Sequence, residues 1–140
     1  MTRHAGTILG DIYDAWRAQD LDWLASYLPD DFTHVMHIPT SVRPQFGMCQ
    51  GKKAVIERWR AVILDYDFLL VDTSGLMTDR NHAAIEIPLR YRHRGTGKLL
   101  EMTKANFWTL EDGWPVKLTE YYDVSYIQSF RASLAAHAVS

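Results

Sequence analysis

The chain has 140 residues, of which 47% are hydrophobic, and this combination suits one folded domain with a substantial core. A formal net charge of −2 excludes the basic field that nucleic acid or an anionic membrane would require, so a small partner is expected. Cys49 is the only cysteine, which excludes an intrachain disulfide, and no apolar leader or membrane span is visible. We therefore expect a cytoplasmic protein with a single domain over residues 1–140 and a core at about 7–135.

Three helices are predicted in the first half of the chain. Apolar residues at helical spacing predict the first over 7–19, with Thr7 as its N-cap, and the second follows Asp20 and stops before Pro29. Residues 52–66 predict the third. Between the last two, residues 32–38 predict a short strand, and 39–51, with two prolines and two glycines, predict a loop that could border a pocket.

The pattern changes from Phe68 onward to runs of β-branched and aromatic residues separated by turn signals at 79–82, 94–97 and 111–113. Four antiparallel strands joined by hairpins are expected, followed by a helical turn or short helix near 127–134. Helices followed by a sheet indicate an α+β fold in one domain.

The register of the last hairpin decides which side chains face the core, because a slip of one residue exchanges the two faces of a strand. A two-residue turn at Asp112-Gly113 and a three-residue loop with Gly113 in the left-handed conformation give opposite results. The second unites Trp108 with the apolar residues of the last strand. It also places Asn106 and Glu120 on that buried face, as cross-strand neighbours.

A carboxylate on an apolar face is costly unless it is hydrogen-bonded, protonated or beside a wetted cavity. One interpretation is a structural pair in which Asn106 satisfies Glu120. The other is a pocket between sheet and helices, in which burial raises the pKa of Glu120 toward neutrality and Asn106 orients it. Both interpretations remain open from the sequence.

The segment 91–123, YRHRGTGKLLEMTKANFWTLEDGWPVKLTEYYD, and residues 16–35 resemble the SnoaL-like branch of the nuclear transport factor 2-like superfamily. This superfamily includes polyketide cyclases, ketosteroid isomerase and limonene epoxide hydrolase. The resemblance covers nearly the whole chain. It implies a cystatin-like fold, in which three N-terminal helices pack in a cone against a strongly curved, mostly antiparallel sheet around a deep apolar pocket.

The resemblance also suggests residue roles. Glu120 falls where the cyclases and the epoxide hydrolase keep a catalytic aspartate, and Asn106 falls where the cyclases have a histidine and the isomerase a protonated aspartate. Met36 stands where the isomerase has its general base, and Ile12 or Tyr13 where it has its donor tyrosine. These departures speak against ketosteroid isomerisation in that form.

His34 and His37 are three apart on a predicted strand and therefore point to opposite faces, so no metal site is expected. His34 is either a proton-transfer partner in the pocket or a hydrogen-bonded histidine without a catalytic role. The candidate catalytic residues are thus Glu120, Asn106 and His34. The candidate substrate contacts are Tyr13, Trp16, Met36, Trp59, Lys104, Trp108, Leu118 and Tyr122.

Two functions follow as hypotheses. The first is an isomerase, cyclase or lyase that acts by general acid/base chemistry on a small apolar compound bearing a carbonyl or hydroxyl group. The second is a non-catalytic module that binds an apolar ligand or serves as a dimerising accessory. Neither nucleotide-binding glycine motif is present, so no cofactor is expected. We expect a homodimer through the outer sheet face, which carries Phe107 and Tyr121.

Overall fold

The computed structural model describes residues 4–37 and 47–139, and within them four helices and one sheet form an α+β fold. The helices are α1 (Ala5–Arg17), α2 (Leu21–Tyr27), α3 (Lys52–Asp65) and α4 (Val124–Val139). The strands are β1 (Thr33–Met36), β2 (Met48–Gln50), β3 (Tyr66–Val71), β4 (Met77–Thr78), β5 (His82–His93), β6 (Leu99–Glu111) and β7 (Trp114–Tyr121). None of the described helices is long and apolar enough to cross a membrane.

The strands form one mixed sheet in the order β2-β1-β7-β6-β5-β3, with β4 paired to the edge of β5. The four antiparallel strands predicted from the second half of the chain are β3, β5, β6 and β7, and their pairing confirms that expectation. The short strand β1 lies parallel to β7, with Met36 beside Glu120. The non-local contact between β1 and β7 makes the sheet mixed.

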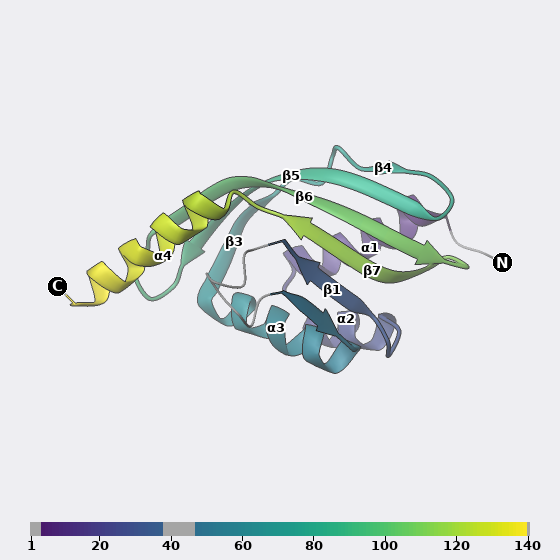
Figure 1. The fold of residues 1–140 in the computed structure, drawn as a ribbon, viewed down its shortest axis with the longest axis horizontal. Coiled ribbons are helices and arrows are strands. Elements are labelled where there is room, and N and C mark those ends of the chain that lie inside the picture. Colours follow the sequence, from purple (N-terminus) through teal and green to yellow (C-terminus); the bar gives the residue numbers. More distant parts are fainter. Residues whose placement is uncertain (1–3, 38–46, 140) are drawn as a thin grey trace.

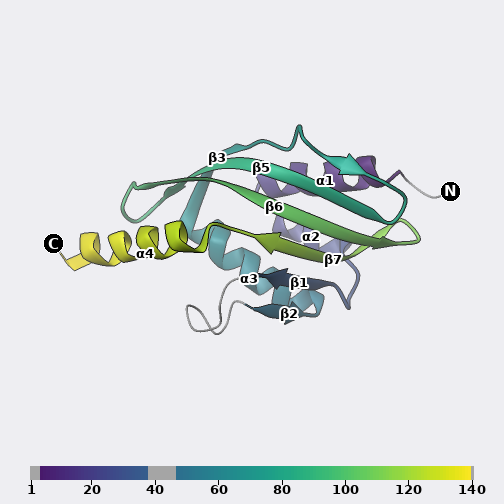
Figure 2. The ribbon, with the colours of Figure 1, turned by 45° about the horizontal axis from the view of Figure 1, so that its top comes forward.

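Helices α1, α2 and α3 lie on one face of the sheet, and α4 projects from its end opposite α1 (Figures 1 and 2). The core lies between this face and the helices, where Ile8, Leu9 and Leu24 are buried against Ile87 and Leu110. The implied cone of three helices omits α4, and the strong curvature expected of the sheet is not confirmed.

The helix boundaries differ from the prediction at three points. α1 begins two residues before Thr7, because the side chain of His4 accepts a hydrogen bond from the Gly6 N–H and acts as the N-cap. It ends at Arg17, before Gln19 with its left-handed backbone. Asp20 caps α2 as predicted, since its carboxylate accepts from the Trp23 N–H at 3.0 Å. α4 runs for 16 residues, longer than the predicted helical turn, because its alanine-rich end favours helix.

The predicted loop 39–51 also needs a correction. Residues 48–50 form β2, whose Cys49 pairs with His34 of β1. The remaining part of that prediction, residues 39–46, lies outside the described residues.

The hairpin between β6 and β7 combines the two predicted registers. Its turn is the two-residue one, with left-handed backbone at both Asp112 (φ 50°) and Gly113 (φ 82°), as a type I′ turn requires. Val116 is then an extra residue in β7, a β-bulge that shifts the pairing by one. Beyond the bulge, Asn106 pairs with Glu120 and Trp108 with Leu118, which is the predicted register of the buried face.

Candidate functional site

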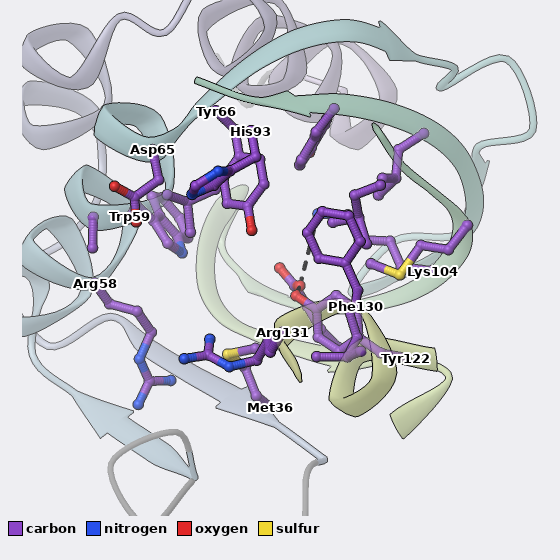
Figure 3. Close-up of a pocket in the computed structure, with 18 of the residues that line it drawn as sticks. Met36, Arg58, Trp59, Asp65, Tyr66, His93, Lys104, Tyr122, Phe130 and Arg131 are labelled. Atoms are coloured by element: carbon purple, nitrogen blue, oxygen red, sulfur yellow. Dashed lines mark hydrogen bonds and ion pairs between the residues drawn. The ribbon is translucent and has the colours of Figure 1, made fainter. Parts of the chain in front are cut away.

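A cavity of about 440 Å³ opens between the inner face of the sheet, α3 and α4. Its walls are mainly apolar and aromatic, and Figure 3 shows side chains from several elements converging on it. The apolar lining includes Trp16, Trp59, Tyr91, Leu100, Met102 and Phe130. One part of this wall is a polar cluster, where Glu120, Lys104, His34 and Tyr122 meet.

Glu120 is the centre of this polar cluster. The residue is only 4% exposed, and its carboxylate has a different partner on each oxygen: Oε1 lies 3.2 Å from His34 Nε2, and Oε2 lies 3.7 Å from Lys104 Nζ. The Tyr122 hydroxyl also donates a hydrogen bond to Oε2. Three elements supply the cluster, because β7 carries Glu120, β6 carries Lys104 and β1 carries His34. The carboxylate is therefore satisfied without Asn106.

The charges of this cluster support one another. Burial alone would raise the pKa of Glu120, but Lys104 and His34 outweigh it and hold this pKa well below its ordinary value. Burial alone would lower the pKa of Lys104, but Glu120 outweighs it and raises this pKa above its ordinary value. The expected rise in the pKa of Glu120 toward neutrality is thus wrong, because the sequence did not reveal Lys104 as its partner. Glu120 is an ionised carboxylate paired with a charged lysine.

His34 is 2% exposed and lies between this pair and Arg58 of α3. Arg58 NH1 lies 3.3 Å from His34 Nδ1, and it also donates to the Gly47 carbonyl at 3.0 Å. A guanidinium can only donate, so the contact with Arg58 makes Nδ1 the acceptor and leaves a ring proton on Nε2, facing Glu120. The Nε2 contact is close but lacks hydrogen-bond alignment. The imidazole is held on both sides, and its Nδ1 lone pair is the one available to a proton.

Asn106 belongs to a second polar group behind the cavity wall. Its Nδ2 donates to the Tyr13 hydroxyl at 2.8 Å, and Trp108 Nε1 donates to the same oxygen at 2.8 Å. Burial raises the pKa of Tyr13 to about 12, so this hydroxyl stays neutral. Asn106 Oδ1 is buried without a hydrogen-bond partner in the described part of the chain, beside a small cavity of about 30 Å³. Asn106 does not orient Glu120 by a hydrogen bond, although the two are neighbours across the strands.

The predicted site residues lie around two cavities that share part of their wall, because Trp16, Trp59, Lys104 and Glu120 line both. Seven of them line the large cavity: Trp16, His34, Met36, Trp59, Lys104, Glu120 and Tyr122. The other four surround the small cavity instead: Tyr13, Asn106, Trp108 and Leu118. These four residues lie on the predicted inner face of the fold, but around the small cavity, which Leu24 of α2 also lines.

Sequence reasoning missed two arginines on the large cavity, Arg58 and Arg131. Arg58 precedes Trp59 in α3 and looks like an ordinary residue of a polar helix face. Arg131 lies in the part of α4 that the sequence predicted only as a turn or short helix. Its spacing from Ile127, Phe130 and Leu134, which also line the cavity, was the available signal. Within residues 4–37 and 47–139, no three histidine, cysteine or acidic side chains are grouped to hold a metal ion.

Comparisons with known proteins place the chain in a family. Residues 9–121 match the family model of the SnoaL-like domain. A proposed isomerase from Rhodopseudomonas palustris has a similar structure, with a TM-score of 0.78 and 22% sequence identity, over 93% of this chain and 98% of that one. For a proposed SnoaL-like polyketide cyclase from Mesorhizobium loti, these values are 0.67 and 16%, over 86% and 100%.

A protein from Catenulispora acidiphila with a ketosteroid isomerase-like fold, in complex with trimethylamine, gives a TM-score of 0.69 at 15% identity, over 91% of each chain. A search of the curated proteins found no match. At these identities the structural likeness shows the fold alone. The family model, however, spans most of the chain, and it gives the conclusion: this protein belongs to the SnoaL-like domain family.

Proposed function

We propose that the protein is a single-domain, cofactor-independent acid/base enzyme, an isomerase, cyclase or lyase, acting on a small, mainly apolar compound with a carbonyl or hydroxyl group. The observation that carries this proposal is the contact of His34 with Glu120 at the wall of a largely apolar cavity. A volume of about 440 Å³ suits a small organic ligand. Isomerase and cyclase names among the structural relatives agree with it.

In this proposal His34 carries the proton. Imidazole suits proton transfer in both directions near neutral pH, and Nδ1 can accept a proton from a carbon next to the carbonyl of the ligand. Arg58 must first yield its contact with Nδ1, which at 3.3 Å is a long hydrogen bond. A proton from the imidazolium, which can exchange with solvent, then returns to the ligand, so no net proton is consumed.

Glu120 serves here as the positioning residue for His34. Its ionised carboxylate lies 3.2 Å from Nε2, where it stabilises the imidazolium that forms when Nδ1 takes up a proton. Lys104 keeps this carboxylate ionised despite its burial. Tyr122, which already donates to Glu120, completes the arrangement. Asn106, which the sequence suggested as a catalytic residue, instead supports the cavity wall through its hydrogen bond to Tyr13.

The test measures proton exchange directly. Cyclohexanone, 2-tetralone and 4-oxo-4-phenylbutanoate are incubated with the protein in D₂O, and deuterium uptake next to the carbonyl is followed by NMR. We expect exchange above the buffer rate for at least one ketone and a fall of about 100-fold in His34→Gln. His82→Gln is the matched control, since His82 also faces a carboxylate, Asp79 at 3.9 Å, but on the surface.

Exchange at the buffer rate for every ketone, or equal rates in wild type and His34→Gln, would contradict the proposal. The melting temperature of His34→Gln is measured alongside, so that unfolding is not mistaken for lost chemistry. The second function, a non-catalytic binding module, is favoured by the saturation of Glu120 with three partners. For a binding module, we expect a ligand to bind in the cavity and the rate of proton exchange to be the same in wild type and His34→Gln.

We further propose a homodimer through the outer sheet face. Phe107 and Tyr121 are 48% and 44% exposed there and contact each other edge to face, and His37 stacks on Tyr121 at 4.3 Å. Exposed aromatic surface of this kind favours association. Sedimentation at micromolar concentration tests it: we expect a dimer for wild type and a monomer for Tyr121→Asp, and a wild-type monomer would contradict it.

A further inference from the structure

The charges around the large cavity are unevenly distributed. Among the residues that the structure describes, five charged side chains line it: Arg58, Asp65, Lys104, Glu120 and Arg131. Lys104 and Glu120 form an ion pair deep in the wall, so together they add little net charge. Asp65 lies on the other side of the cavity from Arg131, beside Tyr66 (Figure 3). The remaining side of the cavity therefore carries the positive charge of the two arginines.

Arg58 and Arg131 come from different helices, α3 and α4, and converge on the same part of the cavity. Figure 3 shows the Arg131 guanidinium directed toward the side of the cavity where Arg58 lies, beside Met36, and both side chains line the cavity. Like charges do not gather at one place without cost. Two guanidinium groups directed into one region are an arrangement that an anion would stabilise.

Arg131 is exposed, and its side chain has no ion pair or hydrogen bond with any residue that the structure describes. Residues 38–46, which are not described, include no aspartate or glutamate, so they offer no acidic side chain to pair with it. Arg58, by contrast, is held in place by the Gly47 carbonyl and His34. One arginine is thus fixed at the cavity and the other is without an acidic partner in the described chain.

We propose that the ligand of this cavity is an amphipathic organic anion, whose acidic head group lies between Arg58 and Arg131 while its apolar body enters among Trp59, Leu100 and Phe130. This inference deepens the proposed function and rests on it for the assumption that the cavity takes a ligand. A planar carboxylate suits the fork of a guanidinium, which can bind both of its oxygens. A head group held by Arg58 also draws that arginine away from His34 Nδ1, which the proposed proton transfer requires.

The experiment compares an acid with its neutral amide. Binding of 4-phenylbutyrate and of 4-phenylbutyramide is measured by titration calorimetry, because the two differ only in the charged head group. We expect wild type to bind the acid about tenfold more tightly, the effect of one partly exposed charge-assisted contact. Arg131→Gln should reduce this preference to within about twofold while binding the amide unchanged. Arg60→Gln, an exposed α3 arginine paired with Glu57, is the matched control and should keep the tenfold preference.

Each other outcome overturns part or all of the inference. Equal binding of acid and amide by wild type would remove the anion site and leave the cavity as a ligand site. An unchanged preference in Arg131→Gln would remove Arg131 from the site. Failure of both compounds to bind would contradict the assumption that this cavity takes a ligand. The proposed proton transfer by His34 is tested by the separate exchange experiment, so the two proposals can fail independently. A third probe, 3-phenylpropylphosphonate, compares the two acidic head groups: where the carboxylate already binds more tightly than the amide, the tighter of the two anions identifies the head group that the site prefers.

Discussion

Two clusters in this molecule each hold a carboxylate between basic groups, one inside and one at the surface. At the surface, Arg92 and Arg94 each approach Asp67 to 2.8 Å. Inside, Lys104 and His34 approach Glu120 only to 3.7 Å and 3.2 Å. The shorter contacts contribute less to the stability of the fold, because water screens the surface cluster and would solvate its members if they separated.

The pKa of both carboxyl groups is lowered, but for different reasons. The pKa of Asp67 is lowered by hydrogen bonds from Arg92 and then Arg94, with little burial to oppose them. The pKa of Glu120 is lowered against a large opposing effect of burial. Removing one member of the buried cluster leaves a charge that water cannot reach, so the same substitution has very different effects at the two places.

Lys104→Met should have the largest effect. It leaves Glu120 buried without its charged partner, and we expect a loss of about 3–5 kcal/mol in the free energy of unfolding. Urea denaturation of wild type and variant measures it. A loss as small as that of a surface substitution would mean that His34 and Tyr122 alone satisfy the carboxylate.

Glu120→Gln should come next, with a loss of about 1–3 kcal/mol, because an amide replaces the partner of a charged lysine. This reverses the expectation for a carboxyl with a raised pKa, whose neutralisation would leave the fold as stable as before. Combining the substitutions as Lys104→Met/Glu120→Gln should recover much of the loss, since no buried charge remains. Additive losses in this double-mutant cycle would contradict the pairing of the two side chains.

Acid should weaken the buried cluster in wild type. Because the folded-state pKa of Glu120 is lowered, its contribution to stability is present above the ordinary glutamate pKa of about 4.3 and is lost as the pH falls below it. Denaturation midpoints from about pH 6 to about pH 3 should therefore fall more steeply for wild type than for Glu120→Gln. Parallel pH profiles would show that Glu120 is not ionised in the fold.

Asp67→Asn should have the smallest effect at neutral pH. Arg92 and Arg94 are partly exposed and can turn to water, so we expect a denaturation midpoint close to that of wild type. A loss as large as that of Glu120→Gln would remove the distinction between the two clusters.

The sequence predicted the buried face well because that face depends on alternation within two hairpins. The turn indicated at 94–97 leads to the pairing of Tyr91 with Leu100, and Asn106 pairs with Glu120 as expected. These contacts are local, and the hydrophobic pattern determines them. The parallel pairing of β1 with β7 joins segments that are far apart in the sequence, so the residue pattern of either strand does not predict it.

The partners within the site were harder to predict for the same reason. Lys104 and Glu120 are on one face, which the sequence indicated, but their approach depends on how side chains turn within the packed interior. Asn106 was placed beside Glu120 correctly, yet its amide turns to Tyr13 of α1. Arg131 required knowledge of α4, whose length the sequence analysis underestimated. A residue's face was therefore predictable, whereas its partner was not.

The bulge at Val116 has a consequence for how the length of this hairpin can vary. It separates the pairing at the Asp112-Gly113 turn from the pairing that directs Glu120 inward. A chain lacking Val116 could continue the turn's pairing as a regular ladder and still set Asn106 opposite Glu120. Relatives that differ by one residue at this tip can therefore share the same interior, and an alignment that opens its gap elsewhere in β7 would compare inward residues with outward ones.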